Sequence, residues 1–296
     1  MGLDCYFDSE KNQLEVLHNA GFFALCSATL WALTSLYPAE KYVKVNWPGQ
    51  DVWRDKEQAG MNLFDMYFHP NAALDPHSLS SCPAGDPHGI YKRLRFDKLN
   101  PYVQNYFALS DIVRTKKEEL ISKYKIDFDN TIALCYRGTS KWLEIAPVPP
   151  PYYIEEARRL LARNHKLRVL VQTDQLQVRE IYLLRLGDRA FTIDEMPVTP
   201  WMDSLHTISE SQRGISNFEF GVRLLAVVSI LSKCKFVITH TGSVGLWTCL
   251  FRGNARNTCQ LRPIQPPDII SNYDYEIWPR RVFRRSMARF QRWTKS

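Results

Sequence analysis

A short basic segment follows a largely apolar run near the middle of the chain. Residues 131–136 lead directly into Arg137, Gly138, Thr139, Ser140 and Lys141. The planar guanidinium of arginine matches phosphate oxygens in a bidentate geometry, and glycine lets a ligand approach the backbone closely. The segment therefore suits a diphosphate, although a loop whose arginine forms a structural ion pair would have the same composition.

A second polar segment connects an apolar run, residues 236–239, to a predicted helix. It consists of His240, Thr241, Gly242, Ser243, Val244 and Gly245. Backbone N–H groups at a helix N-terminus attract anions, so this segment could also face a phosphate. It lacks the Gly-Lys-Ser/Thr of a P-loop and the full dinucleotide fingerprint. The alternative is a tight turn in which glycine adopts a positive φ and Ser243 caps the helix.

Two carboxylates complete the candidate chemistry. Asp174 follows Thr173 at the end of the run 167–172 and could accept hydrogen bonds from a ribose or base edge. Aspartate is strongly preferred as a helix cap, so we favour capping for Asp174. Glu144 is the carboxylate nearest to the basic segment and could act as a general base, although a lone glutamate is more often solvated or paired.

None of these polar segments contains the Asp-x-Asp pair that usually holds a divalent metal on a sugar nucleotide. The charge of a leaving diphosphate would then have to be offset by Arg137, Lys141 and a helix dipole. We therefore expect neither a metal nor another cofactor, with a nucleotide sugar as co-substrate.

The order of the surrounding elements predicts how these segments are positioned. Strands are expected at 14–17, 42–47, 131–136, 167–172, 190–193 and 236–239, and helices at 22–37, 110–125, 152–164, 175–184 and 221–232. Open α/β sheets bind ligands at the carboxyl ends of their strands. We expect an α/β fold of two doubly wound, Rossmann-like domains facing a cleft. Residues 1–125 would form the acceptor side, 126–265 the nucleotide-sugar domain, and 266–296 a basic helix packing back on the body.

Composition narrows the class of protein. The net charge of +7 comes largely from the C-terminal stretch, so the rest of the chain is nearly neutral and nucleic-acid binding is disfavoured. An alternative for that basic stretch is peripheral contact with an anionic membrane surface. The 7 cysteines form no CxxC pair or zinc-type cluster and are expected to be mostly buried free thiols. Without a signal-peptide pattern or a span of about 20 apolar residues, we expect a cytoplasmic protein or the soluble part of a longer one.

Taken together, the segments resemble motifs of the α-1,6-fucosyltransferases and the related O-fucosyltransferases. Residues 131–141 resemble the Arg-Arg-Thr-Asp-Lys motif, and 169–174 resemble the strand that ends in Thr-Asp. Residues 231–243 are similar to a third motif, whose serine contacts the β-phosphate. The segment 19–23, which contains Gly21 and Phe22, resembles the N-terminal glycine loop of these enzymes.

The resemblance implies a GT-B fold, inversion at the anomeric carbon, no metal, GDP-fucose as donor and a glycan or glycoprotein acceptor. It assigns diphosphate contacts to Arg137 and Ser243, a leaving-group role to Lys141 and a base role to Glu144. The donor-binding set that we expect is Gly21, Phe22, Arg137, Gly138, Thr139, Ser140, Thr173, Asp174, His240, Thr241, Gly242, Ser243 and Val244.

Several positions depart from the family pattern. Gly138 replaces the second arginine and Ser140 the aspartate, while Cys135 and Val227 stand near the positions of the guanine-reading histidine and aspartate. A UDP-sugar transferase of the same fold and a non-catalytic nucleotide- or glycan-binding module therefore stay open as alternatives. Candidate stacking surfaces for a glycan, each more often a core residue, are Trp47, Trp53, Tyr67, Trp142 and Trp201.

Overall fold

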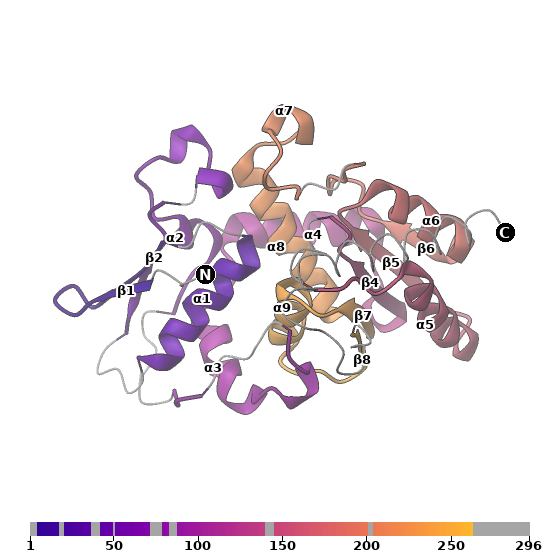
Figure 1. Cartoon of the computed structure of the whole chain (residues 1–296), viewed down its shortest axis with the longest axis horizontal. Coiled ribbons are helices and arrows are strands. Elements are labelled where there is room, and N and C mark those ends of the chain that lie inside the picture. The colour runs from indigo at the N-terminus through magenta and orange to yellow at the C-terminus, as the bar shows by residue number, and fades with distance from the viewer. Residues whose placement is uncertain are drawn as a thin grey trace, which may run out of the picture. The chain divides into compact units, whose positions relative to one another are not determined.

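The computed structural model of the chain (Figure 1) describes residues 5–17, 21–36, 42–49, 51–71, 79–82, 88–139, 145–200 and 204–262. The chain forms two compact units that interleave along the sequence. Unit 1 comprises Met1–Lys125, Ser209–Lys233 and Gly242–Arg256; unit 2 comprises Ile126–Ile208, Cys234–Thr241 and Asn257–Ser296. The first division at Lys125 coincides with the expected one, but two segments expected in the second domain group with the first.

Unit 2 contains a five-stranded parallel sheet within its described residues. Its strands are β4 Thr131–Tyr136, β5 Arg168–Thr173, β6 Ala190–Thr192, β7 Phe236–His240 and β8 Thr258–Leu261, in the order β6-β5-β4-β7-β8. The strand order therefore reverses beside β4, between β5 and β7. This is the arrangement of a doubly wound sheet, and the prediction for this half of the chain is confirmed.

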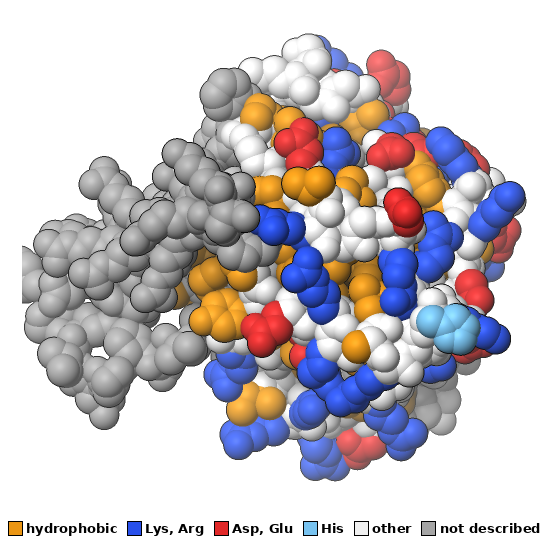
Figure 2. Space-filling view, turned by 90° about the vertical axis from the view of Figure 1, so that its right-hand side faces the viewer, with side chains coloured by type: hydrophobic (Ala, Val, Ile, Leu, Met, Phe, Trp, Pro, Cys, Tyr) orange, Lys and Arg blue, Asp and Glu red, His pale blue; other side chains and the backbone are white. Residues whose placement is uncertain are grey.

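Two helices pack against one face of this sheet. They are α5 Pro150–Arg163 and α6 Leu176–Leu186. Alternate strand residues such as Ile132, Leu134 and Val171 meet Tyr153 and Tyr182 of the helices in one buried cluster. Every residue of β4 is buried, which is why its sequence is a continuous apolar run rather than an alternating one. Figure 2 shows the side of the molecule where α5 and α6 lie, with Lys and Arg side chains spread over it and Asp and Glu between them.

Unit 1 has a smaller sheet and most of the helices. Its strands are β1 Cys5–Asp8, β2 Gln13–Val16 and β3 Lys44–Asn46, with β1 antiparallel and β3 parallel to β2. Its helices are α1 Phe22–Ser35, α2 Leu63–Tyr67, α3 Phe96–Tyr106, α4 Asp111–Tyr124, α7 Glu210–Arg213, α8 Asn217–Lys233 and α9 Ser243–Arg252. The described part of the first half thus holds one β-α-β unit, β2-α1-β3.

Short 3₁₀ turns connect the longer elements. They are η1 Asp51–Trp53, η2 Lys56–Gln58, η4 Tyr91–Arg93, η5 Phe128–Asn130 and η7 Gly187–Arg189.

The apolar helix α1 is buried in unit 1. Its hydroxyls accept hydrogen bonds from two buried indoles: Trp47 Nε1 donates to Thr29 Oγ1 and Trp247 Nε1 to Ser27 Oγ, both at 2.9 Å. The hydroxyl groups in this apolar stretch therefore serve as hydrogen-bond acceptors for the indole N–H groups of buried tryptophans. Among the described helices, none is both long and apolar enough to cross a membrane.

Three of the aromatic residues considered as glycan-stacking surfaces lie in the core of unit 1. Trp47, Trp53 and Tyr67 are fully buried, and Phe22 packs edge-on against each of them. Their aromatic faces are therefore used in packing, as the general preference of such residues predicts. Trp142 and Trp201 lie outside the described residues.

Candidate functional site

The polar segments that follow β4, β5 and β7 leave the same edge of the unit 2 sheet. Tyr136 of β4 pairs with Thr173 of β5, and Cys135 with Thr239 of β7, so the carboxyl ends of the three strands lie side by side. Arg137, Asp174 and Thr241 follow these ends directly or within a residue. This edge, where the strand order reverses, is the ligand-binding edge of an open α/β sheet.

The carboxylate of Asp174 holds the loop after β4. It accepts hydrogen bonds from Gly138 N at 2.9 Å and from Thr139 Oγ1 at 2.6 Å. Its Oδ2 also lies 3.8 Å from Arg137 Nε. One carboxylate thus contacts three consecutive residues of the loop and fixes their backbone course.

The capping role favoured for Asp174 is wrong. The N-cap of α6 is Gln175, which makes no side-chain capping hydrogen bond. Thr173 Oγ1 instead accepts a hydrogen bond from Gln175 N at 3.2 Å. The carboxylate of Asp174 is directed to the neighbouring loop because that loop offers it a backbone N–H, a hydroxyl and a cation.

Gly138 is a position at which the structure leaves no room for a side chain. A Cβ built there would lie 2.1 Å from Gln175 Oε1 and 2.7 Å from Tyr136 Cε1, and both of those side chains are buried. An arginine at this position, as in the Arg-Arg-Thr-Asp-Lys motif, would therefore clash with Gln175 in its present position. Sequence reasoning did not identify Gln175.

Gly138→Ala is accordingly expected to destabilise the chain by about 1–3 kcal/mol, because the added methyl group overpacks a buried contact. Urea denaturation measures this loss. Gln175→Ala in the same chain should recover part of it, since it removes the nearer clash. Gly49→Ala is the matched control, because a Cβ at Gly49 meets no atom within 4 Å. Equal stability of the Gly138 and Gly49 variants would contradict the steric argument.

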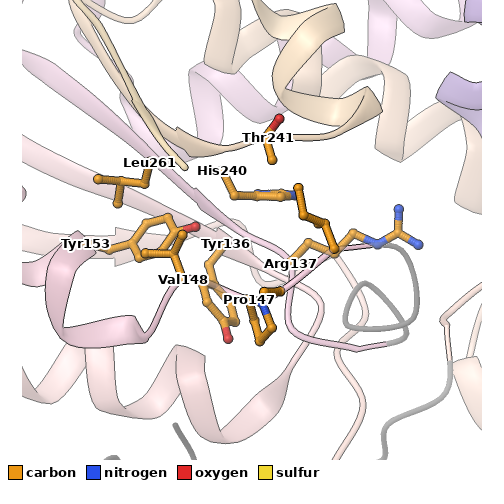
Figure 3. A pocket seen from close by; sticks show the side chains of 10 residues that line it. Tyr136, Arg137, Pro147, Val148, Tyr153, His240, Thr241 and Leu261 are labelled. Atoms are coloured by element: carbon orange, nitrogen blue, oxygen red, sulfur yellow. The ribbon is translucent and has the colours of Figure 1, made fainter. Parts of the chain in front are cut away.

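A pocket opens beside Arg137 in unit 2. Its lining residues are Tyr136, Arg137, Ile145, Ala146, Pro147, Val148, Tyr153, His240, Thr241 and Leu261. Figure 3 shows the Arg137 side chain extending away from the rings of Tyr136 and Tyr153, and it is 24% exposed. The guanidinium is thus partly open to solvent. The apolar lining from Ile145 to Val148 was not predicted, although the proline-rich stretch after the basic segment was the available signal.

The proposed catalytic residues Lys141 and Glu144 lie outside the described residues, as does Ser140. Of the glycine loop, Asn19 and Ala20 are likewise outside. Gly21 is the N-cap of α1, and a Cβ there would meet open space. Phe22 as a whole residue is 1% exposed, so neither its ring nor its backbone is accessible to a donor.

The segment after β7 forms the start of α9. Gly242 is the N-cap, with φ 145° and ψ 172°, a region that is open essentially to glycine alone. The predicted glycine with a positive φ is therefore confirmed, but the helix has no side-chain cap, so the prediction that Ser243 caps it is wrong. His240 and Thr241 are buried, while Ser243 and Val244 are half-buried in the first turn.

Neither residue at the guanine-reading positions presents an acceptor to solvent. Cys135 is buried, and burial, with a smaller contribution from Asp174, raises the pKa of its thiol to about 12. Val227 is 2% exposed within α8. Cys26, Cys82, Cys234 and Cys249 are also buried and form no disulfide, whereas Cys5 and Cys259 are half-buried. The prediction that most of the cysteines are buried free thiols is confirmed.

The sequence does contain an Asp-x-Asp, at Asp127 and Asp129. It precedes β4 and therefore lies at the opposite edge of the sheet from Arg137. The Asp127 carboxylate caps η5, accepting from Asp129 N at 3.1 Å and from Asn130 Nδ2 at 2.8 Å. Within the described ranges, no three His, Cys, Asp or Glu side chains gather into a group able to hold a metal ion.

Comparison with solved structures finds the NodZ α-1,6-fucosyltransferase. The structure co-crystallised with GDP has a TM-score of 0.49 and 15% sequence identity, covering 80% of this chain and 90% of that one. The fucosyltransferase NodZ from Bradyrhizobium has a TM-score of 0.48 and 15% identity, covering 80% and 91%. Neither a protein-family profile nor a curated protein sequence matches the chain.

Proposed function

We propose that the chain is an inverting, metal-independent GT-B glycosyltransferase that moves fucose from GDP-fucose to a hydroxyl of a glycan or glycoprotein. The observation that carries this proposal is the arrangement around Arg137. A partly exposed guanidinium lies at the edge of the sheet where the strand order reverses, on a loop held by the Asp174 carboxylate. The identities of the sugar, fucose, and of the nucleotide, GDP, are inferred from the motif resemblance.

The chemistry follows from the charges available at this edge. The acceptor hydroxyl attacks the anomeric carbon from the face opposite the nucleotide, and the bond to the diphosphate oxygen breaks with its electron pair on that oxygen. Arg137 stabilises the departing charge. Lys141 adds a cation to the leaving group, and Glu144 takes the proton of the acceptor.

A UDP-sugar transferase of the same fold is the second candidate. The observation that favours it is the burial of Cys135 and Val227, which leaves both guanine-reading positions without an exposed hydrogen-bond acceptor. A GDP-sugar would then have to be recognised through other groups, whereas the phosphate-binding residues would serve any nucleoside diphosphate.

The melting temperature of the chain, measured in turn with GDP, UDP, ADP and CDP, distinguishes these two candidate functions. A diphosphate at 100 times its dissociation constant stabilises a folded chain by about 2.7 kcal/mol. We expect GDP to raise the melting temperature by about 5 °C, and the other three nucleotides by less. A larger rise with UDP would support the second candidate. If none of the four changes the melting temperature, the proposed function is wrong.

A non-catalytic binding module is distinguished by turnover. The purified chain, supplied with GDP-fucose and a glycan acceptor, should release GDP, whereas a binding module would raise the melting temperature without releasing it. Fucosylated product detected by mass spectrometry identifies the acceptor.

A further inference from the structure

The pocket beside Arg137 lies entirely within unit 2, on one face of its sheet. His240 of β7 pairs in register with Leu261 of β8, and residues paired in this way point to the same face. Tyr136 belongs to the apolar cluster that contains Tyr153 of α5, and Leu261 packs against that cluster. The pocket therefore lies at the carboxyl edge of the sheet, on the face that α5 covers, and three strands contribute to its lining.

The remaining wall of the pocket is the loop 145–148, which leads into α5. Its side chains are all apolar, and Val148 is buried in the same cluster, with 9% of the residue exposed. Three prolines restrict the backbone here: Pro147 lies in the loop, Pro149 is the N-cap of α5 and Pro150 is its first residue. The wall is therefore formed before a ligand arrives, and little conformational entropy is lost in ordering it on binding.

The pocket is small and mostly apolar. Most of its lining residues carry aliphatic or aromatic side chains, and the exceptions are Arg137, His240 and Thr241. The enclosed space is about that of a water molecule or a methyl group, which is too small for a sugar ring or a base. Arg137 lines the pocket, while its guanidinium extends away from Tyr136 and Tyr153 and is partly exposed (Figure 3). A small apolar cavity and a cation able to bind phosphate thus share one residue.

We propose that this pocket receives the C6 methyl group of fucose and thereby selects a 6-deoxy sugar in the donor. The inference rests on the proposed function, because it takes Arg137 as the residue that binds the diphosphate of GDP-fucose. The sugar is attached directly to the β-phosphate, so it lies between the guanidinium and the pocket. Removing a methyl group from water favours binding about fourfold, whereas a hydroxyl buried against Val148 and Leu261 would lose its hydrogen bonds to water.

The test compares GDP-fucose with GDP-L-galactose, whose sugar differs from fucose only by a hydroxyl group on C6. Titration calorimetry on the full chain, without an acceptor, measures both affinities. We expect GDP-fucose to bind about thirtyfold more tightly, because the additional hydroxyl would be buried without a hydrogen-bond partner. Equal affinities would overturn the inference. Tighter binding of GDP-L-galactose would overturn it as well, because C6 would then meet a polar group.

Val148→Thr tests the wall of the pocket directly. The substitution adds a hydroxyl that can hydrogen-bond to the C6 hydroxyl of L-galactose, so we expect the ratio of the two affinities to fall about tenfold. Val178→Thr is the matched control, because Val178 of α6 is buried in the same cluster, with 3% of the residue exposed, but does not line the pocket. Its ratio should equal that of the unmodified chain. An unchanged ratio in Val148→Thr, or equal falls in both variants, would contradict the assignment of the pocket.

Ala146→Ser keeps the inference testable if Val148→Thr does not fold. Ala146 lines the pocket and is half-buried, so a hydroxyl there destabilises the fold less. We expect the affinity ratio to fall about threefold, whereas Ala190→Ser, at a half-buried position of β6 that does not line the pocket, should leave it unchanged. A folded Ala146→Ser chain with an unchanged ratio would overturn the inference while leaving the proposed function intact. Failure of the unmodified chain to bind GDP or either GDP-sugar would overturn both.

Discussion

Arg137→Ala is expected to lower donor-sugar turnover about thousandfold, because it removes the cation that stabilises the departing diphosphate. The Arg137 side chain is 24% exposed and lies 3.8 Å from its carboxylate neighbour, so its loss should change the stability of the fold by less than about 1 kcal/mol. Release of GDP from GDP-fucose, followed at saturating acceptor, measures the effect. The turnover of Arg137→Lys should lie between those of the unmodified chain and Arg137→Ala, because lysine keeps the positive charge but cannot form the bidentate contact of a guanidinium.

Arg168→Ala is the control for the loss of a positive charge from unit 2. Arg168 is the first residue of β5, at the opposite edge of the sheet, where its guanidinium lies 4.5 Å from the ring centre of Phe191. Turnover should be unchanged in this variant. Similar turnover in the Arg137 and Arg168 variants would show that the catalytic diphosphate site lies elsewhere.

Asp174→Ala is expected to lower kcat/KM about hundredfold and the free energy of unfolding by about 2–4 kcal/mol. The first effect arises because the Arg137 loop loses the group that positions it, and small misplacements of a catalytic group are costly. The second arises because Gly138 N and Thr139 Oγ1, both bonded to this carboxylate, lose a charged acceptor. Steady-state kinetics and urea denaturation measure the two effects separately.

Two further variants show which feature of Asp174 matters. Asp174→Asn keeps one acceptor oxygen but loses the charge near Arg137, so it should recover more stability than activity. Asp188→Ala removes an exposed carboxylate from η7 of the same unit and should alter neither quantity. Full activity in Asp174→Ala would contradict the positioning role of this carboxylate.

The three central strands of the unit 2 sheet could be predicted from the sequence because they are mostly buried on both faces. The runs at 131–136, 167–172 and 236–239 are rich in apolar residues and match β4, β5 and β7 to within a residue. Helix α3 was missed because Pro101 interrupts its pattern, although the structure accommodates the proline inside the helix. The edge strands β1 and β8 were missed because they are only partly buried.

The grouping of α8 and α9 with unit 1 could not be predicted. It depends on contacts between residues far apart in the chain, such as Ser27 with Trp247 and Tyr91 with Gly242. No local pattern reports such pairs. In the candidate site, the positions of Arg137 and Asp174 could be predicted from the ends of the strands, but the ion pair between them could not. The need for glycine at position 138 could not be predicted either, because it arises from the close approach of the Gln175 side chain.

The interleaving of the two units has a consequence for how the protein is made. Unit 1 needs Ser209–Lys233 and Gly242–Arg256 in addition to Met1–Lys125. As a ribosome synthesises the chain, the first 125 residues emerge long before α8 and α9 do, and buried partners such as Trp247 are still missing. The usual order, in which an N-terminal domain completes its folding during synthesis, is not open to this chain. The aromatic side chains of the first 125 residues therefore remain without their final buried partners until α8 and α9 have been synthesised.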